Sequence, residues 1–293
     1  MLKQISRLKP LLILSASLAF PNLYGESRQP VQTEEGPSPC IGTIRARHIE
    51  PRGVGYNHGY TTIEGLSFPA QDSTYIWPLI DVRGHRFDNN EYAANGGLGF
   101  RYYAPEPQVI FGFNSYIDYR TNHFHKFHFS QVGAGVEILN PYVDVRINGY
   151  LPLKKWERVR KCTFRNSSGK FFISRKKVKA ALEGGDLEIG NALFHNDDIE
   201  LYGAVGTYLY ADHCQNLWGG RYRVHLSVYT HFFVDALITH DPVFGIRGQG
   251  QVGVNIPLGC SGKKSWMQRR LTQPVQRHEI IVLHKYCRWR TNL

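Results

Sequence analysis

Short segments in which apolar and polar residues alternate are the feature that most constrains this chain. In the stretch YVDVRINGYL, residues 142–151, every second residue is apolar or glycine, and the residues between them are polar or aromatic. Successive strand side chains point to opposite faces, so this period predicts a strand with one apolar and one polar face. Such strands occur in soluble sandwiches and in outer-membrane barrels, so one stretch leaves the choice open.

The same alternation recurs along the chain, at residues 108–119, 198–211, 221–232 and 246–257. Glycines interrupt both faces, and the polar faces carry Tyr, Arg, Asp and Gln, which is typical of a hydrogen-bonded barrel interior. The 29 glycines and the 13% aromatic content agree with many strands and tight turns. We therefore predict an all-β fold, a transmembrane antiparallel β-barrel with its apolar face toward lipid.

The strand-like segments number about eleven, and bacterial single-chain barrels close with an even number. They lie near residues 53–66, 75–86, 93–104, 108–119, 127–138, 142–152, 180–193, 198–211, 219–230, 233–240 and 244–258. We assign the missing strand to residues 40–49 and predict about 12 strands. The short connections at 105–107, 140–141 and 195–197 are expected in the periplasm, and the longer alternate connections outside the cell.

The N-terminus has the order of a secretory signal peptide. Basic residues precede an apolar run from Leu11 to Phe20, and Gly25 offers a small residue for cleavage. No later stretch holds the roughly 18 consecutive apolar residues of a spanning helix, so a membrane form must be a closed barrel. We expect a signal peptide at 1–25, a periplasmic segment at 26–50 that includes the first strand, an outer-membrane barrel at 51–260 and a linker-like tail at 261–293.

Three successive strand segments carry motifs in a fixed order. They read as a GxNxYxD strand, a GxGxE strand and a strand ending in NxYxP. The motif residues are Gly112, Asn114, Tyr116, Asp118, Gly133, Gly135, Glu137, Asn148, Tyr150 and Pro152. In order and spacing, this pattern resembles the β-domain of the inverse autotransporters, the intimin and invasin family, with Tyr116 at the family's Phe position. The resemblance extends over roughly residues 50–285 and gives these residues a structural role.

The resemblance implies a twelve-stranded outer-membrane barrel that anchors and helps export a C-terminal passenger of adhesin domains. Residues 269–283 resemble the family segment that leads into a linker threading the lumen. Because the chain ends at Leu293, we expect the passenger to be absent. The expected role is an anchor, translocator or porin-like surface protein in adhesion to host cells, without enzymatic activity. Its expected partners are outer-membrane lipid and lipopolysaccharide, the barrel assembly machinery and the host-cell surface, with no nucleic acid.

Much of the formal net charge of +11 is concentrated between residues 154 and 179. The basic residues there are Lys154, Lys155, Arg158, Arg160, Lys161, Arg165, Lys170, Arg175, Lys176, Lys177 and Lys179. Glu157 alone opposes them in sequence. We interpret this segment as a solvated loop that contacts an anionic partner such as lipopolysaccharide or a host glycan.

Two alternative functions remain open at the level of sequence. The first is an outer-membrane barrel hydrolase, because His128 and Ser130 have the spacing of the base and the hydroxyl in an outer-membrane phospholipase. The second is a soluble periplasmic β-sandwich binding protein, which would also have alternating strands. His123 and His125 lie close to His128 in sequence, but no carboxylate or thiol is nearby, so we expect no metal site there. We also expect no catalytic residue and no other cofactor. The pairing of Cys40, Cys162, Cys214, Cys260 and Cys287 is not readable from sequence.

Overall fold

The computed structural model describes residues 40–69, 75–122, 127–153, 156–165, 172–196, 198–211, 216–229, 231–259 and 265–292. All of these residues belong to one compact unit that begins at Gly36. The expected signal peptide, residues 1–25, lies outside the described residues.

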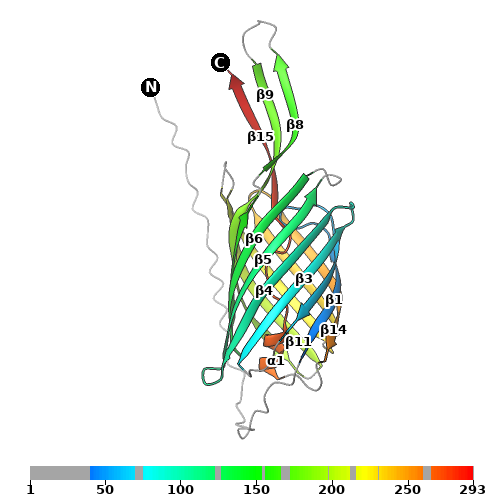
Figure 1. Ribbon diagram of the computed structural model, residues 1–293, viewed down its shortest axis with the longest axis vertical. Helices are drawn as coiled ribbons and strands as arrows, with labels where there is room; N and C mark the ends of the chain where they lie inside the picture. Colours follow the sequence, from blue (N-terminus) through cyan, green and yellow to red (C-terminus); the bar gives the residue numbers. More distant parts are fainter. Residues whose placement is uncertain are drawn as a thin grey trace. The chain divides into compact units, whose positions relative to one another are not determined.

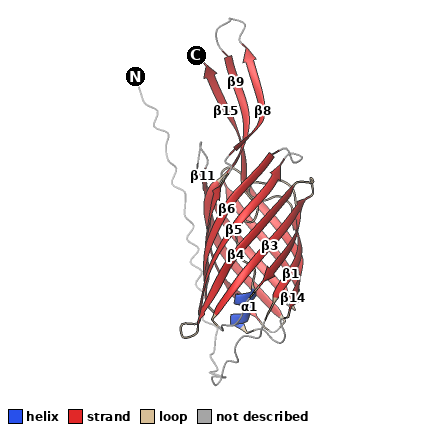
Figure 2. Cartoon of the chain, in the orientation of Figure 1, coloured by secondary structure: helices blue, strands red, loops and turns tan. Residues whose placement is uncertain are grey.

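Twelve antiparallel strands close into a barrel (Figures 1 and 2). They are β1 (Gly42–Glu50), β2 (Tyr60–Ser67), β3 (Ile76–Phe87), β4 (Tyr92–Ala104), β5 (Val109–Asn122), β6 (Phe127–Leu139), β7 (Asp144–Pro152), β10 (Glu183–His195), β11 (Ile199–Ala211), β12 (Asn216–Val228), β13 (Phe232–Asp241) and β14 (Gly245–Leu258). Each pairs with its neighbours in the chain except that β7 pairs with β10 and β1 pairs with β14. The predicted fold class is confirmed, and β1 is the strand that the even count required.

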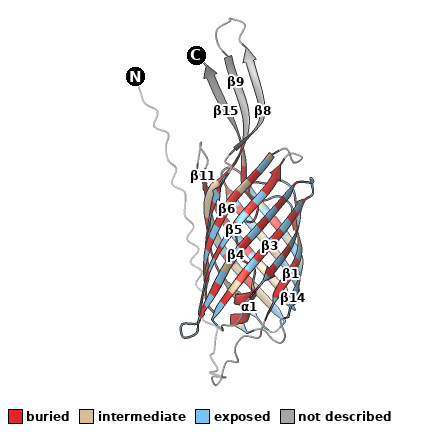
Figure 3. Ribbon diagram, viewed as in Figure 1, coloured by how far each residue is buried: buried red, intermediate tan, exposed pale blue. Residues whose placement is uncertain are grey.

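Burial alternates along the strands, as Figure 3 shows. On β7, Asp144, Arg146 and Asn148 are buried, whereas Ile147 is 50% exposed. Each of the twelve barrel strands has at least one large apolar side chain that is exposed on the outside of the barrel. An exposed apolar surface of this extent is unfavourable in water and is the expected surface of a barrel in lipid. Within the described residues, no helix has the length and apolar character needed to cross a membrane.

The basic segment is not a loop. It forms β8 (Trp156–Arg165) and β9 (Phe172–Ala181), which join β15 (Leu283–Asn292) in a separate three-stranded sheet with the order β15-β9-β8. The loop prediction was wrong because local charge density does not show which distant backbone is available for pairing. Here the last strand of the chain supplies hydrogen-bonding partners for β9, and backbone groups without partners favour such pairing.

The helix α1 (Trp266–Thr272) lies at one end of the barrel, which we call the α1 end. Its Met267 and Leu271 pack in an apolar cluster with Trp77, Tyr103 and Ile110 from the barrel strands. The short connections at 105–108 and 140–143 belong to this end, and the three-stranded sheet emerges at the other, the sheet end. Cys40, which precedes β1, belongs to the same apolar cluster and is disulfide-bonded.

Candidate functional site: the occupied lumen

Charged side chains fill the inner face of the barrel. Those that are buried on the barrel strands are Arg45, Glu64, Asp81, Arg83, Arg101, Asp118, Arg120, Glu137, Asp144, Arg146, Asp186, Glu188, Arg221, Arg223 and Asp241. Buried charges are tolerated when they are paired and hydrogen-bonded. Arg101 Nε donates to Glu137 at 3.0 Å, and Arg223 Nη2 donates to Glu188 at 2.6 Å. The polar faces predicted from alternation therefore form an ion-pair network around the lumen.

The lumen is occupied by the chain itself. After α1, residues 273–282, which we call the lumenal linker, pass along the inner wall toward the sheet end and continue into β15. Its backbone carbonyls accept hydrogen bonds from successive wall side chains. The bonds run from Arg101 to Gln273 O at 2.6 Å, Arg83 to Val275 O at 2.9 Å, Asn148 to Gln276 O at 3.1 Å, Asn95 to Glu279 O at 2.8 Å and Arg120 to Ile281 O at 2.7 Å.

These contacts replace the strand pairing that an extended segment otherwise needs. A buried carbonyl without a partner costs about as much as a lost hydrogen bond, so each wall donor favours this path for the chain. His278 adds the complementary contact, because its backbone N–H donates to Tyr150 Oη at 2.7 Å. The wall thus binds the linker through its main chain as well as its side chains.

Two charged side chains of the linker have matched partners on the wall. Arg277 donates from both Nη atoms to the Asp118 carboxylate, at 2.7 and 2.6 Å, and its guanidinium lies 4.2 Å from the centroid of the Tyr116 ring. Glu279 accepts from Tyr60 Oη at 2.8 Å and from Arg83 at 3.1 Å, and it also pairs with Arg47. Opposite charges two residues apart therefore fix the position of the linker along its path.

The family-motif residues surround this linker. Asn114, Tyr116, Asp118, Glu137 and Tyr150 are all buried on the inner face. The motif glycines supply space, because a Cβ added at Gly133 would lie 2.6 Å from Arg277 Nη2. Of the motif residues, those that contact the lumenal linker are Tyr116, Asp118, Gly133, Asn148 and Tyr150.

Both ends of the linker are fixed. At the α1 end, Arg270 donates to Glu200 at 2.8 Å and lies 3.3 Å from Asp144. At the sheet end, Phe129 and Ile281 pack with Ala181 and Leu283, the residues at which β9 and β15 meet the barrel. The ion pairs and the apolar contacts together prevent the linker from sliding in either direction.

The linker leaves space on the opposite side of the lumen. Two cavities of about 130 and 150 Å³ lie between it and the inner faces of β12, β13 and β14, and both are lined by Arg45 and Arg223. Cavities with charged walls hold water. The lumen therefore has a wall that binds the linker and polar-lined space beside β12, β13 and β14.

The predicted anionic-partner residues fall into three groups. Lys154, Lys155 and Lys170 lie outside the described residues. Arg158, Arg160, Lys161 and Arg165 belong to β8, and Arg175, Lys176 and Lys177 belong to β9. Lys179, in contrast, is only 8% exposed, so its side chain is buried and not on the surface where the anionic contact was predicted.

The strand register adds basic residues that sequence analysis missed. Lys176 of β9 stands opposite Lys161 of β8 on one side and Arg288 of β15 on the other. Arg290 stands opposite Ser174, two residues further along the strands. The alternating basic residues of the C-terminal CRWR stretch could have indicated this extension of the basic surface. They lie far from residues 154–179 in the chain, so the sequence alone did not connect the two segments.

The remaining candidate residues are on the outside of the barrel. His128 and Ser130 alternate with the buried Phe129 on β6, and His128 Nδ1 lies 2.6 Å from Tyr119 Oη. His123 and His125 lie outside the described residues. A group formed by His48, Glu50 and Asp88 was not predicted, because Asp88 follows β3 and is distant in the chain from His48 and Glu50 on β1.

Comparison with known proteins agrees with the fold. Residues 70–192 match the family described as "Inverse autotransporter, beta-domain", which confirms the resemblance inferred from the strand motifs. A solved structure described as "Unveiling the Mechanism Behind the in-meso Crystallization of Membrane Proteins" is similar at a TM-score of 0.61 and 16% identity, over 84% of this chain and 100% of that chain. That identity supports the fold alone. None of the curated proteins compared with the chain matches it.

Two other solved barrels are more distant. The Acinetobacter baumannii outer membrane protein Omp33 is 10% identical, with a TM-score of 0.35, over 76% of this chain and 99% of that one. The β domain of the Bordetella autotransporter BrkA is 9% identical, with a TM-score of 0.37, over 74% of this chain and 100% of that one. At these scores neither structure supports a further argument.

The closed barrel, its apolar exterior and its charged lumen define an outer-membrane β-barrel. Within that class, residues 70–192 match the inverse autotransporter β-domain family. The protein is located in the outer membrane.

Proposed function

We propose that this barrel is an anchor and translocator that holds its own C-terminal chain across the outer membrane. The lumenal linker carries the proposal, because it passes from the α1 end to the sheet end inside the barrel. Outer-membrane barrels have short periplasmic turns and longer external loops. The short connections at 105–108 and 140–143 therefore support an α1 end in the periplasm and a three-stranded sheet outside the cell.

The ion pairs of the linker explain anchoring. Moving the linker by one residue would remove Arg277 from Asp118 and Glu279 from Arg83 together, leaving buried charges without partners. Breaking one buried pair typically costs about 3–5 kcal/mol. We infer a structural rather than a catalytic role, and insertion by the barrel assembly machinery as for other outer-membrane barrels.

Epitope accessibility on intact cells tests this function. An epitope inserted between Asn292 and Leu293 should bind antibody on intact cells, because the linker leads β15 to the outside. The matched control is the same epitope at Glu106 in the short turn at the α1 end, which should be recognised only after the outer membrane is permeabilised. An epitope after Asn292 that stays hidden on intact cells would refute the proposal.

A second candidate function is adhesion through the three-stranded sheet. Directly paired residues of neighbouring strands lie about 4.5–5.5 Å apart at their Cα atoms, and like charges in such pairs are destabilising. The register places Lys161, Lys176 and Arg288 in one row. An anionic glycan, from lipopolysaccharide or from a host-cell surface, is the partner that this row of basic residues favours.

A further inference from the structure

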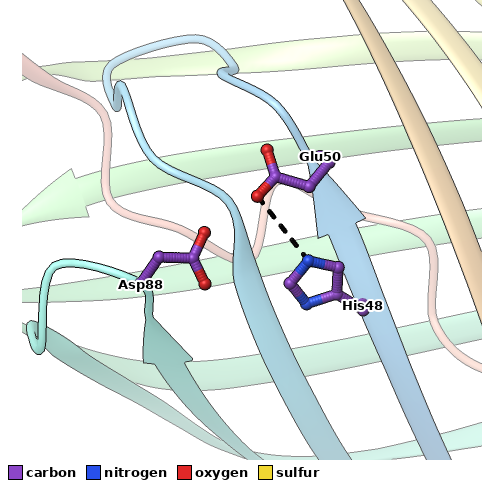
Figure 4. A group of neighbouring side chains, drawn as sticks. All are labelled: His48, Glu50 and Asp88. Atoms are coloured by element: carbon purple, nitrogen blue, oxygen red, sulfur yellow. Dashed lines mark ion pairs between the residues drawn. The ribbon is translucent and has the colours of Figure 1, made fainter.

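Three metal-ligating side chains converge on the outside of the barrel, away from the lumenal linker. His48 and Glu50 lie at the end of β1, and Asp88 follows β3 in the turn toward β4 (Figure 4). One ring nitrogen and one oxygen from each carboxylate all lie within 4.8 Å of one another. The residues meet across β2, which pairs with β1 on one side and with β3 on the other.

The imidazole of His48 is oriented for coordination. Its Nδ1 lies 2.9 Å from Thr61 Oγ1 on β2, and its Nε2 faces Glu50 Oε1 at 3.6 Å. The second distance is too long for a hydrogen bond. It is close to the separation of about 3.3 Å expected for two ligands on one tetrahedral Zn²⁺ with bonds of 2.0–2.1 Å. With the proton on Nδ1, the ring donates to Thr61, an arrangement common in metal-ligating histidines.

Gly59 provides the space in which the carboxylates meet. A Cβ at this position would overlap Glu50 Oε1 and would lie 2.8 Å from Asp88 Oδ2. The Gly59 carbonyl also accepts a hydrogen bond from the Asp88 backbone N–H at 3.1 Å, which positions the turn. Two carboxylates held this close repel each other unless a cation lies between them.

We propose that His48, Glu50 and Asp88 bind a divalent transition-metal cation, for which Zn²⁺ is the best fit. One imidazole and two carboxylates form a mixed nitrogen and oxygen donor set, whereas Ca²⁺ and Mg²⁺ prefer oxygen ligands alone. Two carboxylates and a neutral imidazole carry a formal charge that a divalent cation balances. The His48 and Glu50 side chains are 43% and 50% exposed, so an ion can enter from solvent.

The bound ion would connect β1 to the β3–β4 turn across β2. Three protein ligands leave at least one coordination position for water or an anionic oxygen. This inference does not depend on the proposed anchor function, because the group lies on the outer side of the wall and takes no part in holding the linker.

The test is calorimetric titration of Zn²⁺ into the full chain, refolded in detergent at near-neutral pH, with Ca²⁺ as the comparison cation. We expect His48→Ala, Glu50→Gln and Asp88→Asn each to weaken one Zn²⁺ site at least about tenfold. Thr61→Val should weaken the same site by about 10- to 100-fold, because it removes only the bond that orients the imidazole. The controls His128→Ala and His231→Ala should bind Zn²⁺ at this site with unchanged affinity. A loss of Zn²⁺ binding in either control would reveal binding at that other histidine.

Unchanged Zn²⁺ stoichiometry and affinity in both His48→Ala and Asp88→Asn would overturn the proposal. Tighter binding of Ca²⁺ than of Zn²⁺, insensitive to His48→Ala, would overturn the role of the imidazole. Heat-modifiable gel migration shows whether each variant is folded. If His48→Ala fails to fold, the exposed Glu50→Gln and Asp88→Asn variants decide the question by the same titration.

Discussion

Arg277 and Asp118 form a two-point ion pair between residues 159 positions apart in the chain, with Nη1–Oδ1 and Nη2–Oδ2 distances of 2.7 and 2.6 Å. Asp118 also accepts hydrogen bonds from Asn95 and Gln131, at 2.8 and 3.1 Å. Every oxygen of this carboxylate is therefore occupied. The pair is one of the two charged contacts by which the wall of the barrel holds the linker, and Glu279 with Arg83 is the other.

Asp118→Asn should destabilise the folded barrel by about 3–5 kcal/mol, because it leaves the Arg277 guanidinium buried without its counter-charge. The measurement is the temperature or denaturant concentration at which heat-modifiable migration is lost. The double variant Asp118→Asn with Arg277→Gln should lose less than the sum of the two single variants. Additive losses would show that the two residues are not energetically coupled.

Gly97→Ala should be destabilising while the adjacent Gly96→Ala is nearly neutral. A Cβ at Gly97 would overlap the Tyr116 ring, whereas a Cβ at Gly96 meets nothing within 4 Å. Overpacking a filled interior typically costs about 1–3 kcal/mol, and a surface substitution about 0.5 kcal/mol or less. The free energy of unfolding in urea compares the two variants directly. Equal effects would contradict the assignment of Gly97 to the lumen.

Stability of the sheet end should rise with pH because of Lys179. Burial, and then the nearby charge of Arg120, lower the pKa of Lys179 from 10.5 to about 7. Between these two values the unfolded chain binds more protons than the folded one, so stability increases from pH 7 toward pH 10. Amide hydrogen exchange of β9 at several pH values measures this trend. Lys179→Met should stabilise the sheet end below pH 7 and flatten the trend, and an unchanged trend would exclude Lys179 as its source.

Changing Arg175, Lys176 and Lys177 to Gln should weaken binding to lipopolysaccharide vesicles or to host cells. The residues belong to β9, whose neighbours β8 and β15 are also basic. Removing three positive charges therefore lowers the positive potential that attracts an anionic partner to this sheet. We expect about a tenfold loss at low salt and a smaller difference at high salt, because salt screens exposed charges. Arg52→Gln with Arg86→Gln, two exposed arginines beyond this sheet, is the control. Binding equal to that of the wild type in both assays would refute the contact.

Much of the fold was predictable from local pattern. The alternation in residues 142–151 identified the buried and exposed faces of β7 correctly, and the even strand count located β1. The spacing of Gly133, Gly135 and Glu137 placed these residues together on one strand face. The same reasoning failed for residues 156–165 and 172–181, since their strand conformation depends on pairing with each other and with β15.

The local pattern was enough to assign the apolar and the polar side of each barrel strand, because the pleat of a strand sets side-chain direction locally. Three other features follow from tertiary contacts: Arg277 meets Asp118, Arg288 joins the row of Lys161 and Lys176, and Asp88 joins His48 and Glu50. Each of these contacts joins segments far apart in the chain. Their meeting depends on strand register and on closure of the barrel, which no single segment specifies.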